Sequence, residues 1–94
     1  MAQTNTVTVD GDSTPDGITA DALCTRVIVW SKPSDVTGGY DKYQPAATST
    51  PVRLDDGEKA IFYAGDGQVF KAGQTVGYIK TVNAGPYTFN KQCE

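Results

Sequence analysis

The sequence predicts an all-β protein: a single antiparallel β-sandwich, or a small barrel, of about seven to eight short strands. Glycine (10 residues) and threonine are frequent, a balance that favours strands and turns over helices. Turn-forming residues recur between short apolar runs, and helical periodicity is nearly absent. The 94 residues fit one domain, which we divide into an N-terminal β-arm (1–9) and the sandwich itself (10–94).

The chain is organised around residues 24–30, the longest strongly β-forming run and the one that holds the only tryptophan. Side chains alternate along a strand, so Val27 and Val29 point to one face. Ile28 and Trp30 point to the other face. A strand that is apolar on both faces has one face in the core, and its other face is covered by the irregular loop that follows or by a partner protein.

The remaining segments are short. Residues 1–9 end in an alternation of threonine (4, 6 and 8) with asparagine (5) and valine (7 and 9), and they are either the first strand or an extended tail that orders on a neighbour. Residues 10–22 are an acidic, turn-rich loop, with room for one helical turn at 19–23. Residues 36–50 are irregular apart from one short strand. The strands after the first loop are expected at 23–31, 40–44, 51–54, 59–64, 68–71, 75–82 and 87–89.

Charge and composition argue against several classes of function. The net charge is −3, and the two arginines lie far apart in the sequence, which argues against binding to nucleic acid or to an anionic membrane. No apolar run approaches membrane-spanning length. No basic segment followed by an apolar one is visible at the N-terminus, so we expect the chain to be made and folded in the cytoplasm.

Catalytic chemistry finds little support in these residues. The chain has no histidine, which removes the usual general base and the usual zinc ligand. The serines have no elbow motif, and Gly65-Asp66-Gly67 lacks the helix that a phosphate loop needs. Asp55, Asp56 and Glu58 lie together in an ordinary hairpin turn. We therefore expect no enzymatic activity and no cofactor.

The acidic first loop has part of the ligand spacing of a calcium site. Asp10 and Asp12 have the spacing that begins an EF-hand loop, and Asp21 falls at its last ligand position. However, Pro15 stands where that loop needs glycine, and Thr14 replaces the third ligand. We expect a solvated acidic turn; an irregular calcium site and an acidic patch for a basic partner are the alternatives.

The two cysteines, Cys24 and Cys93, are far apart and do not form a CxxC motif. Two states are open. A disulfide would tie the end of the chain to the central strand, whereas two free thiols would leave one in a strand and one in a frayed tail.

Aromatic residues are the best indication of function. Five tyrosines, three phenylalanines and one tryptophan are more than so thin a domain can bury, and exposed Trp and Tyr favour recognition. We expect Trp30, Tyr40 and Tyr43 to be exposed. With the N-terminal strand and the outer face of the central strand, the interface candidates are Thr4, Thr6, Val7, Val9, Ile28, Trp30, Tyr40 and Tyr43.

One pattern is familiar. Residues 51–62 read P-V-x-L-x-x-G-E-x-x-x-F, and the closing strand runs through residues 70–79. Together with the early apolar strand, this pattern resembles the small β-sandwich decoration (cement) proteins of tailed bacteriophage capsids. The resemblance implies a non-enzymatic virion protein that binds the outside of the head, contacts the major capsid protein, and forms a homo-oligomer (trimer or dimer).

Two other functions fit the same residues. A carbohydrate-binding module would use exposed aromatic rings to stack on sugars. Another phage structural part, such as a tail or baseplate subunit, would share the sandwich fold and the absence of catalytic groups.

Overall fold

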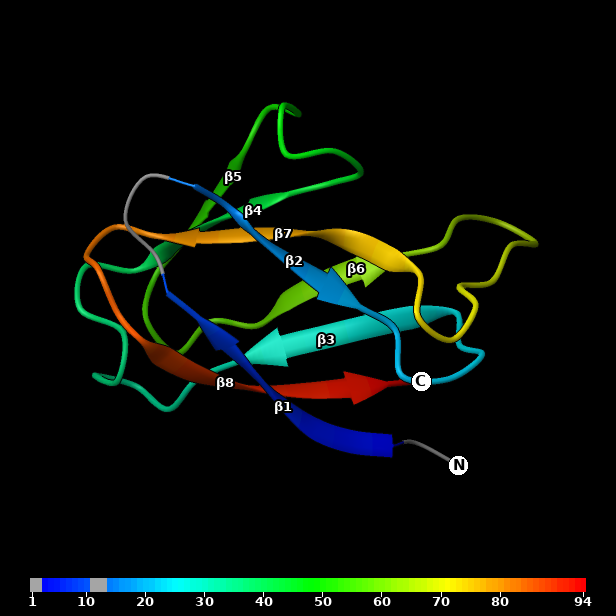
Figure 1. The fold of residues 1–94 in the computed structure, drawn as a ribbon, viewed down its shortest axis with the longest axis horizontal. Helices are drawn as coiled ribbons and strands as arrows, with labels where there is room; N and C mark the ends of the chain where they lie inside the picture. The colour runs from blue at the N-terminus through cyan, green and yellow to red at the C-terminus, as the bar shows by residue number, and fades with distance from the viewer. Residues whose placement is uncertain (1–2, 11–13) are drawn as a thin grey trace.

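The computed structural model describes residues 3–10 and 14–94, and this part of the chain forms strands and no helix. The strands lie in two four-stranded sheets, with orders β1-β8-β3-β6 and β2-β7-β4-β5, and every pair is antiparallel (Figure 1). The predicted all-β sandwich is confirmed. The strands are β1 (Gln3–Val9), β2 (Asp16–Thr19), β3 (Arg26–Trp30), β4 (Tyr40–Tyr43), β5 (Val52–Leu54), β6 (Ala60–Tyr63), β7 (Thr75–Thr81) and β8 (Tyr87–Cys93).

This strand order is that of a jelly roll. Apart from the β4–β5 hairpin, each connection between consecutive described strands passes from one sheet to the other. The first and last strands are neighbours, and β8 lies between β1 and β3. The order therefore joins the two ends of the chain within one sheet.

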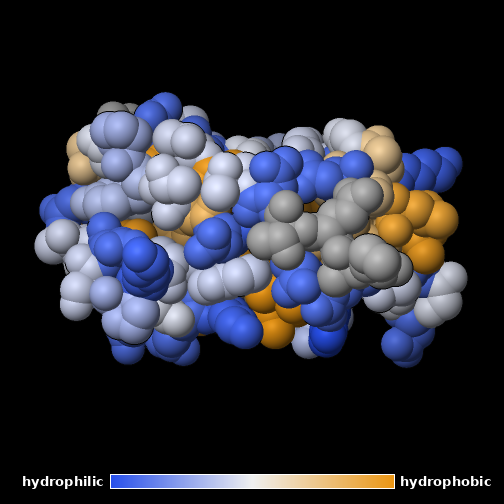
Figure 2. Space-filling view, turned by 90° about the horizontal axis from the view of Figure 1, so that it is seen from below, coloured by the Kyte–Doolittle hydropathy of each residue, from blue (hydrophilic) through white to orange (hydrophobic). Residues whose placement is uncertain are grey.

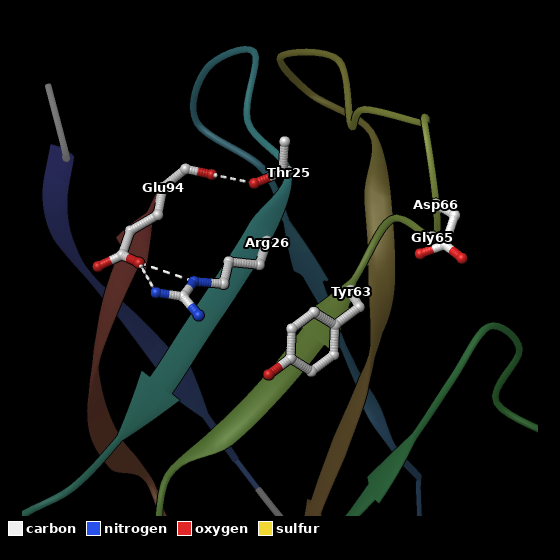
Figure 3. A pocket seen from close by; sticks show the side chains of 6 residues that line it. All are labelled: Thr25, Arg26, Tyr63, Gly65, Asp66 and Glu94. Carbon is white, nitrogen blue, oxygen red and sulfur yellow. Dashed lines mark hydrogen bonds and ion pairs between the residues drawn. The ribbon is translucent and has the colours of Figure 1, made fainter.

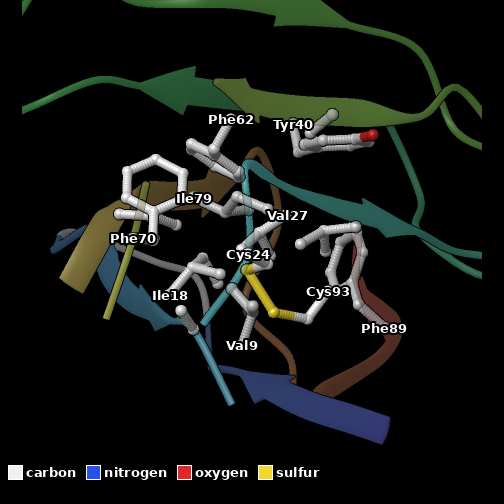
Figure 4. Close-up of a cluster of buried hydrophobic side chains, with 14 of the residues drawn as sticks. Val9, Ile18, Cys24, Val27, Tyr40, Phe62, Phe70, Ile79, Phe89 and Cys93 are labelled. Carbon is white, nitrogen blue, oxygen red and sulfur yellow. A yellow bond between two sulfur atoms is a disulfide. The ribbon is translucent and has the colours of Figure 1, made fainter. Parts of the chain in front are cut away.

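The core lies between the two sheets (Figure 4). Val27 and Val29 of the central strand are fully buried, as their alternation predicts. The rings of Tyr40 and Phe89, from opposite sheets, meet edge to face with centroids 5.2 Å apart. The other core side chains include Val9, Phe62 and Cys93 from the first sheet and Ile18, Val76 and Ile79 from the second.

The N-terminal segment is the first strand of the sandwich, which is one of the two alternatives that the sequence left open. β1 pairs with β8 in a regular register from Gln3 opposite Cys93 to Val9 opposite Tyr87. Val9 is fully buried in the core, so it was wrongly chosen as an interface residue. Residues 1–2 of the predicted arm lie outside the described residues.

Three element boundaries differ from those predicted. β2 lies inside the expected loop and is followed by bends in place of a helical turn. Residues 68–71 contribute a single bridge, from Phe70 to Cys24, in place of a strand. β8 continues through a polar stretch as far as Cys93. These segments have few apolar residues of their own, so their conformations depend on distant partners.

Lys91 shows how a polar strand enters the core. Its side chain points inward from β8 and is only 5% exposed. The ammonium group donates to the Thr19 carbonyl at 2.8 Å and pairs with Asp21 Oδ1 at 3.0 Å. Thr19 is the last residue of β2 and Asp21 follows two residues later, so the two contacts tie this end of β2 to the other sheet. Asp21 Oδ2 is buried without a hydrogen-bond partner, so the carboxylate depends on Lys91 for its compensation.

We predict that Asp21→Ala destabilises the fold by about 3–5 kcal/mol, because it leaves the Lys91 charge buried without its counterion. The double variant Asp21→Ala/Lys91→Met removes both charges and replaces the lysine with an apolar chain of similar length, and we expect a change within about 1.5 kcal/mol. Urea denaturation of both variants measures the difference. An equal loss in the two would contradict this assignment.

At Gly77 of β7 the two sheets approach each other closely. A Cβ atom at this position would lie against the ring of Phe62, in the opposite sheet, and 2.5 Å from the Tyr43 carbonyl oxygen. Both neighbours belong to strands, and Phe62 is fully buried, so neither has room to move away. The absent side chain therefore makes the space that Phe62 fills.

We predict that Gly77→Ala destabilises the protein by about 1–3 kcal/mol through overpacking against Phe62. The matched control is Gly17→Ala in β2, where the new Cβ would lie at an ordinary 3.5 Å from the Tyr78 ring. Denaturant midpoints should fall for the first variant and stay near the wild-type value for the second. If the denaturant midpoints of both variants equal that of the wild type, the close approach at Gly77 does not contribute to stability.

Candidate functional site

The strongest candidate site is the outer face of β3 and β6. Strand register places directly opposed residues on the same face, and Ile28 opposes Ile61 while Arg26 opposes Tyr63. Trp30 completes the face, with the Lys59 ammonium 5.4 Å from the centre of its ring. We call this surface the aromatic face; its residues are Arg26, Ile28, Trp30, Lys59, Ile61 and Tyr63.

The aromatic face has an apolar middle and polar ends. Ile28 is only 7% exposed, whereas Trp30 and Ile61 are half-buried and the ring of Tyr63 is 55% exposed. Trp30 lies four positions after Arg26 in the strand, so the face is about 13 Å long. The neighbouring β8 continues it with neutral polar side chains, because Gln92 lies opposite Ile28 and Asn90 lies opposite Trp30. An apolar centre with a polar rim is the usual pattern of a protein interface.

One end of the face opens into a pocket of about 460 Å³ (Figure 3). The guanidinium of Arg26 donates through two nitrogens to one carboxylate oxygen of Glu94. This hydrogen bond and the charge of Glu94 raise the pKa of Arg26. The exposed ring of Tyr63 stands on the other side of Arg26 (Figure 3). The pocket is lined by Thr25, Arg26, Tyr63, Gly65, Asp66 and Glu94.

A disulfide lies directly behind this pocket. Cys24 and Cys93 are joined, with their Cα atoms 5.7 Å apart, and both are buried (Figure 4). Their chain neighbours Thr25 and Glu94 line the pocket, and the Thr25 hydroxyl donates to the Glu94 carbonyl at 3.1 Å. The disulfide thus fixes the segment carrying Glu94 beside the segment carrying Arg26.

The predicted site residues do not come together. Ile28 and Trp30 lie on the aromatic face, whereas Tyr43 is on the outer face of the opposite sheet, directly across from Tyr78. Thr6 is exposed and Val7 partly buried on β1, and Thr4 belongs to the same strand.

Tyr40 was wrongly predicted to be an exposed contact residue. It is fully buried, and its hydroxyl donates to the Glu58 carbonyl, which satisfies the polar end of the ring inside the protein. Burial, with the nearby charges of Glu58 and Asp56, raises the pKa of Tyr40. The sequence did not reveal this burial because the next inward residue of β4 is the polar Lys42, which hides the alternation.

Sequence reasoning missed Tyr63, the most exposed ring of the aromatic face. A usable signal was present. Ala60 and Phe62 are apolar and alternate in β6, so their burial turns Ile61 and Tyr63 outward together. What the sequence did not provide was the register that sets these residues beside Ile28 and Arg26.

The acidic residues of the first loop do not gather in the described part of the chain. Asp21 pairs with Lys91, and Asp16 accepts a hydrogen bond from the Asp10 backbone N–H at 2.8 Å. Asp12 lies outside the described residues. Within residues 3–10 and 14–94, no group of three acidic or cysteine side chains is arranged to hold a metal ion.

Comparison of the chain with models of protein families, with curated proteins and with solved structures finds no match. In the described residues, no helix has the length and apolar character needed to cross a membrane.

We predict that replacing both cysteines with alanine lowers stability by about 4 kcal/mol, the chain-entropy value for a closed loop of this length. The Arg26–Glu94 pair is substantially exposed, so Glu94→Gln should cost no more than about 1 kcal/mol. Thermal and urea unfolding of the two variants measure both effects. A double-cysteine variant as stable as the wild type would show that the disulfide does not hold this end of the sandwich.

Proposed function

We propose that this chain is a non-enzymatic structural protein of a phage virion that docks on the outer surface of the capsid through its aromatic face and stabilises the head. The observation that carries the proposal is the gathering of Trp30, Tyr63 and Arg26 on one face. These three residue types dominate the binding energy of protein interfaces. The capsid as partner comes from the resemblance of residues 51–62 and 70–79 to decoration proteins.

The electrostatics of the face suit such a role. The chain carries a net charge of −3, but the aromatic face carries Lys59 and Arg26 and no acidic residue of its own. Glu94 neutralises Arg26, so Lys59 is left as the charge beside Trp30. The side chain of Lys59 covers part of the indole and would have to be matched by an acceptor on the partner. A neutral or mildly acidic coat surface meets that requirement.

Stabilisation would follow from mass action. A protein that binds the assembled lattice and not the separate coat subunits shifts the equilibrium toward the lattice. No catalytic group or cofactor is required for this function, and the contact surface can lie on rigid strands.

A carbohydrate-binding function is the second candidate, and a different surface favours it. Tyr43 and Tyr78 are directly opposed on the outer face of the other sheet, and both rings are half-buried. Gly17 lies opposite Tyr78 in the neighbouring strand β2, and because it is a glycine no side chain from this position covers the Tyr78 ring. Two adjacent tyrosines form a platform on which a sugar can stack. Jelly rolls include both viral capsid and lectin domains, so topology does not separate the two candidates.

We predict that Trp30→Ala and Tyr63→Ala each reduce the amount of protein that cosediments with purified phage heads lacking it, by about tenfold or more at limiting concentration. Tyr63 is exposed, so its removal should leave the melting temperature nearly unchanged. Trp30→Ala should likewise affect binding more than stability. Measured occupancy and thermal unfolding together make the comparison.

The matched control is Tyr43→Ala, which removes an aromatic ring from the opposite sheet. It should leave head binding intact. Equal occupancy of wild type, Trp30→Ala and Tyr63→Ala on the heads would refute the capsid proposal. Binding of the isolated domain to a glycan array, lost in Tyr43→Ala, would establish the carbohydrate function in its place.

A further inference from the structure

Each of the two sheets ends in edge strands, which present backbone N–H and C=O groups without a strand partner. Exposed edges invite pairing with another chain, so proteins usually protect them with short strands, charged side chains, proline or bulges. The edge strands here are β1 and β6 in one sheet and β2 and β5 in the other. The four edges are not treated alike.

The edge of β6 is covered by side chains from the opposite sheet. The carbonyl of Ile61 accepts a hydrogen bond from Lys42 Nζ at 2.9 Å, and the carbonyl of Tyr63 accepts one from Gln44 Nε2 at 2.7 Å. The Lys42 ammonium also lies 5.7 Å from the centre of the Phe62 ring. Another strand would have to displace these contacts before it could pair with β6.

The edges of the second sheet are short or irregular. β5 has three residues, follows Pro51 directly, and carries Arg53, whose guanidinium donates to the Gly38 carbonyl. β2 has four residues, and its register shifts between Ile18 and Thr19. Short length, proline, charge and a register shift each discourage pairing.

β1 has none of these protections. It is seven residues long, reads Gln-Thr-Asn-Thr-Val-Thr-Val, and contains no charge, proline or glycine. Its register with β8 is regular over the whole length. Threonine and valine favour extended strands, and Thr6 and Thr8 are exposed.

The hydrogen-bond pattern of β8 shows which groups of β1 face outward. Arg26 and Glu94 exchange both backbone hydrogen bonds, at 3.2 and 2.9 Å. Bonded pairs alternate along an antiparallel ladder, so the even-numbered residues of β8 bond to β3 and the odd-numbered ones bond to β1. In β1 the odd-numbered residues therefore bond to β8.

It follows that the backbone groups of Thr4, Thr6 and Thr8 point away from the sheet. The contact of Thr6 agrees, because its N–H donates to the side-chain oxygen of Asn5 at 2.8 Å. Among the described residues, no backbone hydrogen bond is made on this side by Thr6 or Thr8. Apart from the Thr6 N–H, whose contact with the exposed Asn5 side chain a second strand would replace, these outward groups form an unpaired ladder edge.

We propose that two copies of this chain pair antiparallel through β1, about a two-fold axis at Thr6. Thr6 would face Thr6 of the second copy, and Thr4 would face Thr8, which forms about six backbone hydrogen bonds. The β1 edges of two copies are compatible with each other. β1 has no charged residue, so pairing brings no like charges together, and threonine pairs are favourable between adjacent strands. A second copy fits this edge without any requirement for a partner of opposite charge, and the contact is isologous.

A dimer formed through β1 would also affect the proposed binding to capsids. The dimer itself does not depend on that proposed function. A two-fold axis perpendicular to the joined sheet leaves both aromatic faces on the same side of an eight-stranded sheet. The dimer would then engage a repeating surface at two points, which strengthens binding through avidity.

Sedimentation equilibrium of the purified protein tests the pairing. From about 1 µM to about 1 mM the average mass should rise from the monomer value toward twice that value. Thr6→Lys places two positive charges opposite each other at the axis and should keep the protein monomeric. Thr6→Pro removes the outward N–H without touching the β1–β8 ladder and should do the same.

The matched control is Thr88→Lys, on the strand beside β1 and opposite Thr8. It adds the same charge one strand away from the edge and should still dimerise. Amide exchange supplies a second measurement that needs no variant. The Thr8 amide should become protected as concentration rises, whereas the Val7 amide should be protected throughout.

A wild-type protein that stays monomeric across this range would overturn the proposal, as would a dimer or trimer that persists in both Thr6→Lys and Thr6→Pro. Head binding by a monomeric protein would leave the capsid proposal standing while refuting this one. A dimer that fails to bind heads would do the reverse.

Discussion

The sandwich depends on how its last strand is held between β1 and β3. β1 and β3 do not pair with each other, and β8 joins them by pairing with both. The sequence of β8 is largely polar, so burial of apolar side chains contributes little to its insertion into the sheet. Three interactions compensate. Phe89 reaches Tyr40 across the core, Lys91 is paired with Asp21, and Cys93 is bonded to Cys24. Every one of them joins segments that are distant in the sequence.

This dependence explains what the sequence could and could not predict. The apolar alternation of β3, β6 and β7 is local, so the strands and the inward faces of Val27 and Val29 were predictable. β2 and the second half of β8 were not, because their side chains are mostly polar and long-range contacts hold them in place, among them the Lys91–Asp21 pair and the Cys24–Cys93 disulfide.

The candidate site was predictable only in part. Alternation placed Ile28 and Trp30 together on the outer face of the central strand, but strand pairing decides what lies beside them. Tyr63 and Ile61 enter the aromatic face through the register of β6, and Tyr40 leaves the surface because β4 packs with that side inward. Register is a long-range property, and a single sequence carries no direct record of it.

The molecule thus presents two aromatic surfaces on opposite sides, and they differ in character. The aromatic face on β3 and β6 combines aliphatic, indole, phenol and cationic groups, which suits a protein surface. The opposite sheet offers two tyrosines beside a glycine, which is a simpler platform. Both lie on strands of a disulfide-linked sandwich, so neither surface needs to be ordered on binding.

If two copies pair through β1 as proposed, the side chains of Lys42 and Gln44 on the β6 edge would limit the size of the assembly. A sheet with one open edge and one closed edge can join only one other copy, and that union uses up the open edge of both. Were β6 uncovered, each copy would have two ends to offer, and pairing end to end would extend into a fibre. In the proposed dimer, the two capped carbonyls would make the difference between an assembly of fixed size and an endless one.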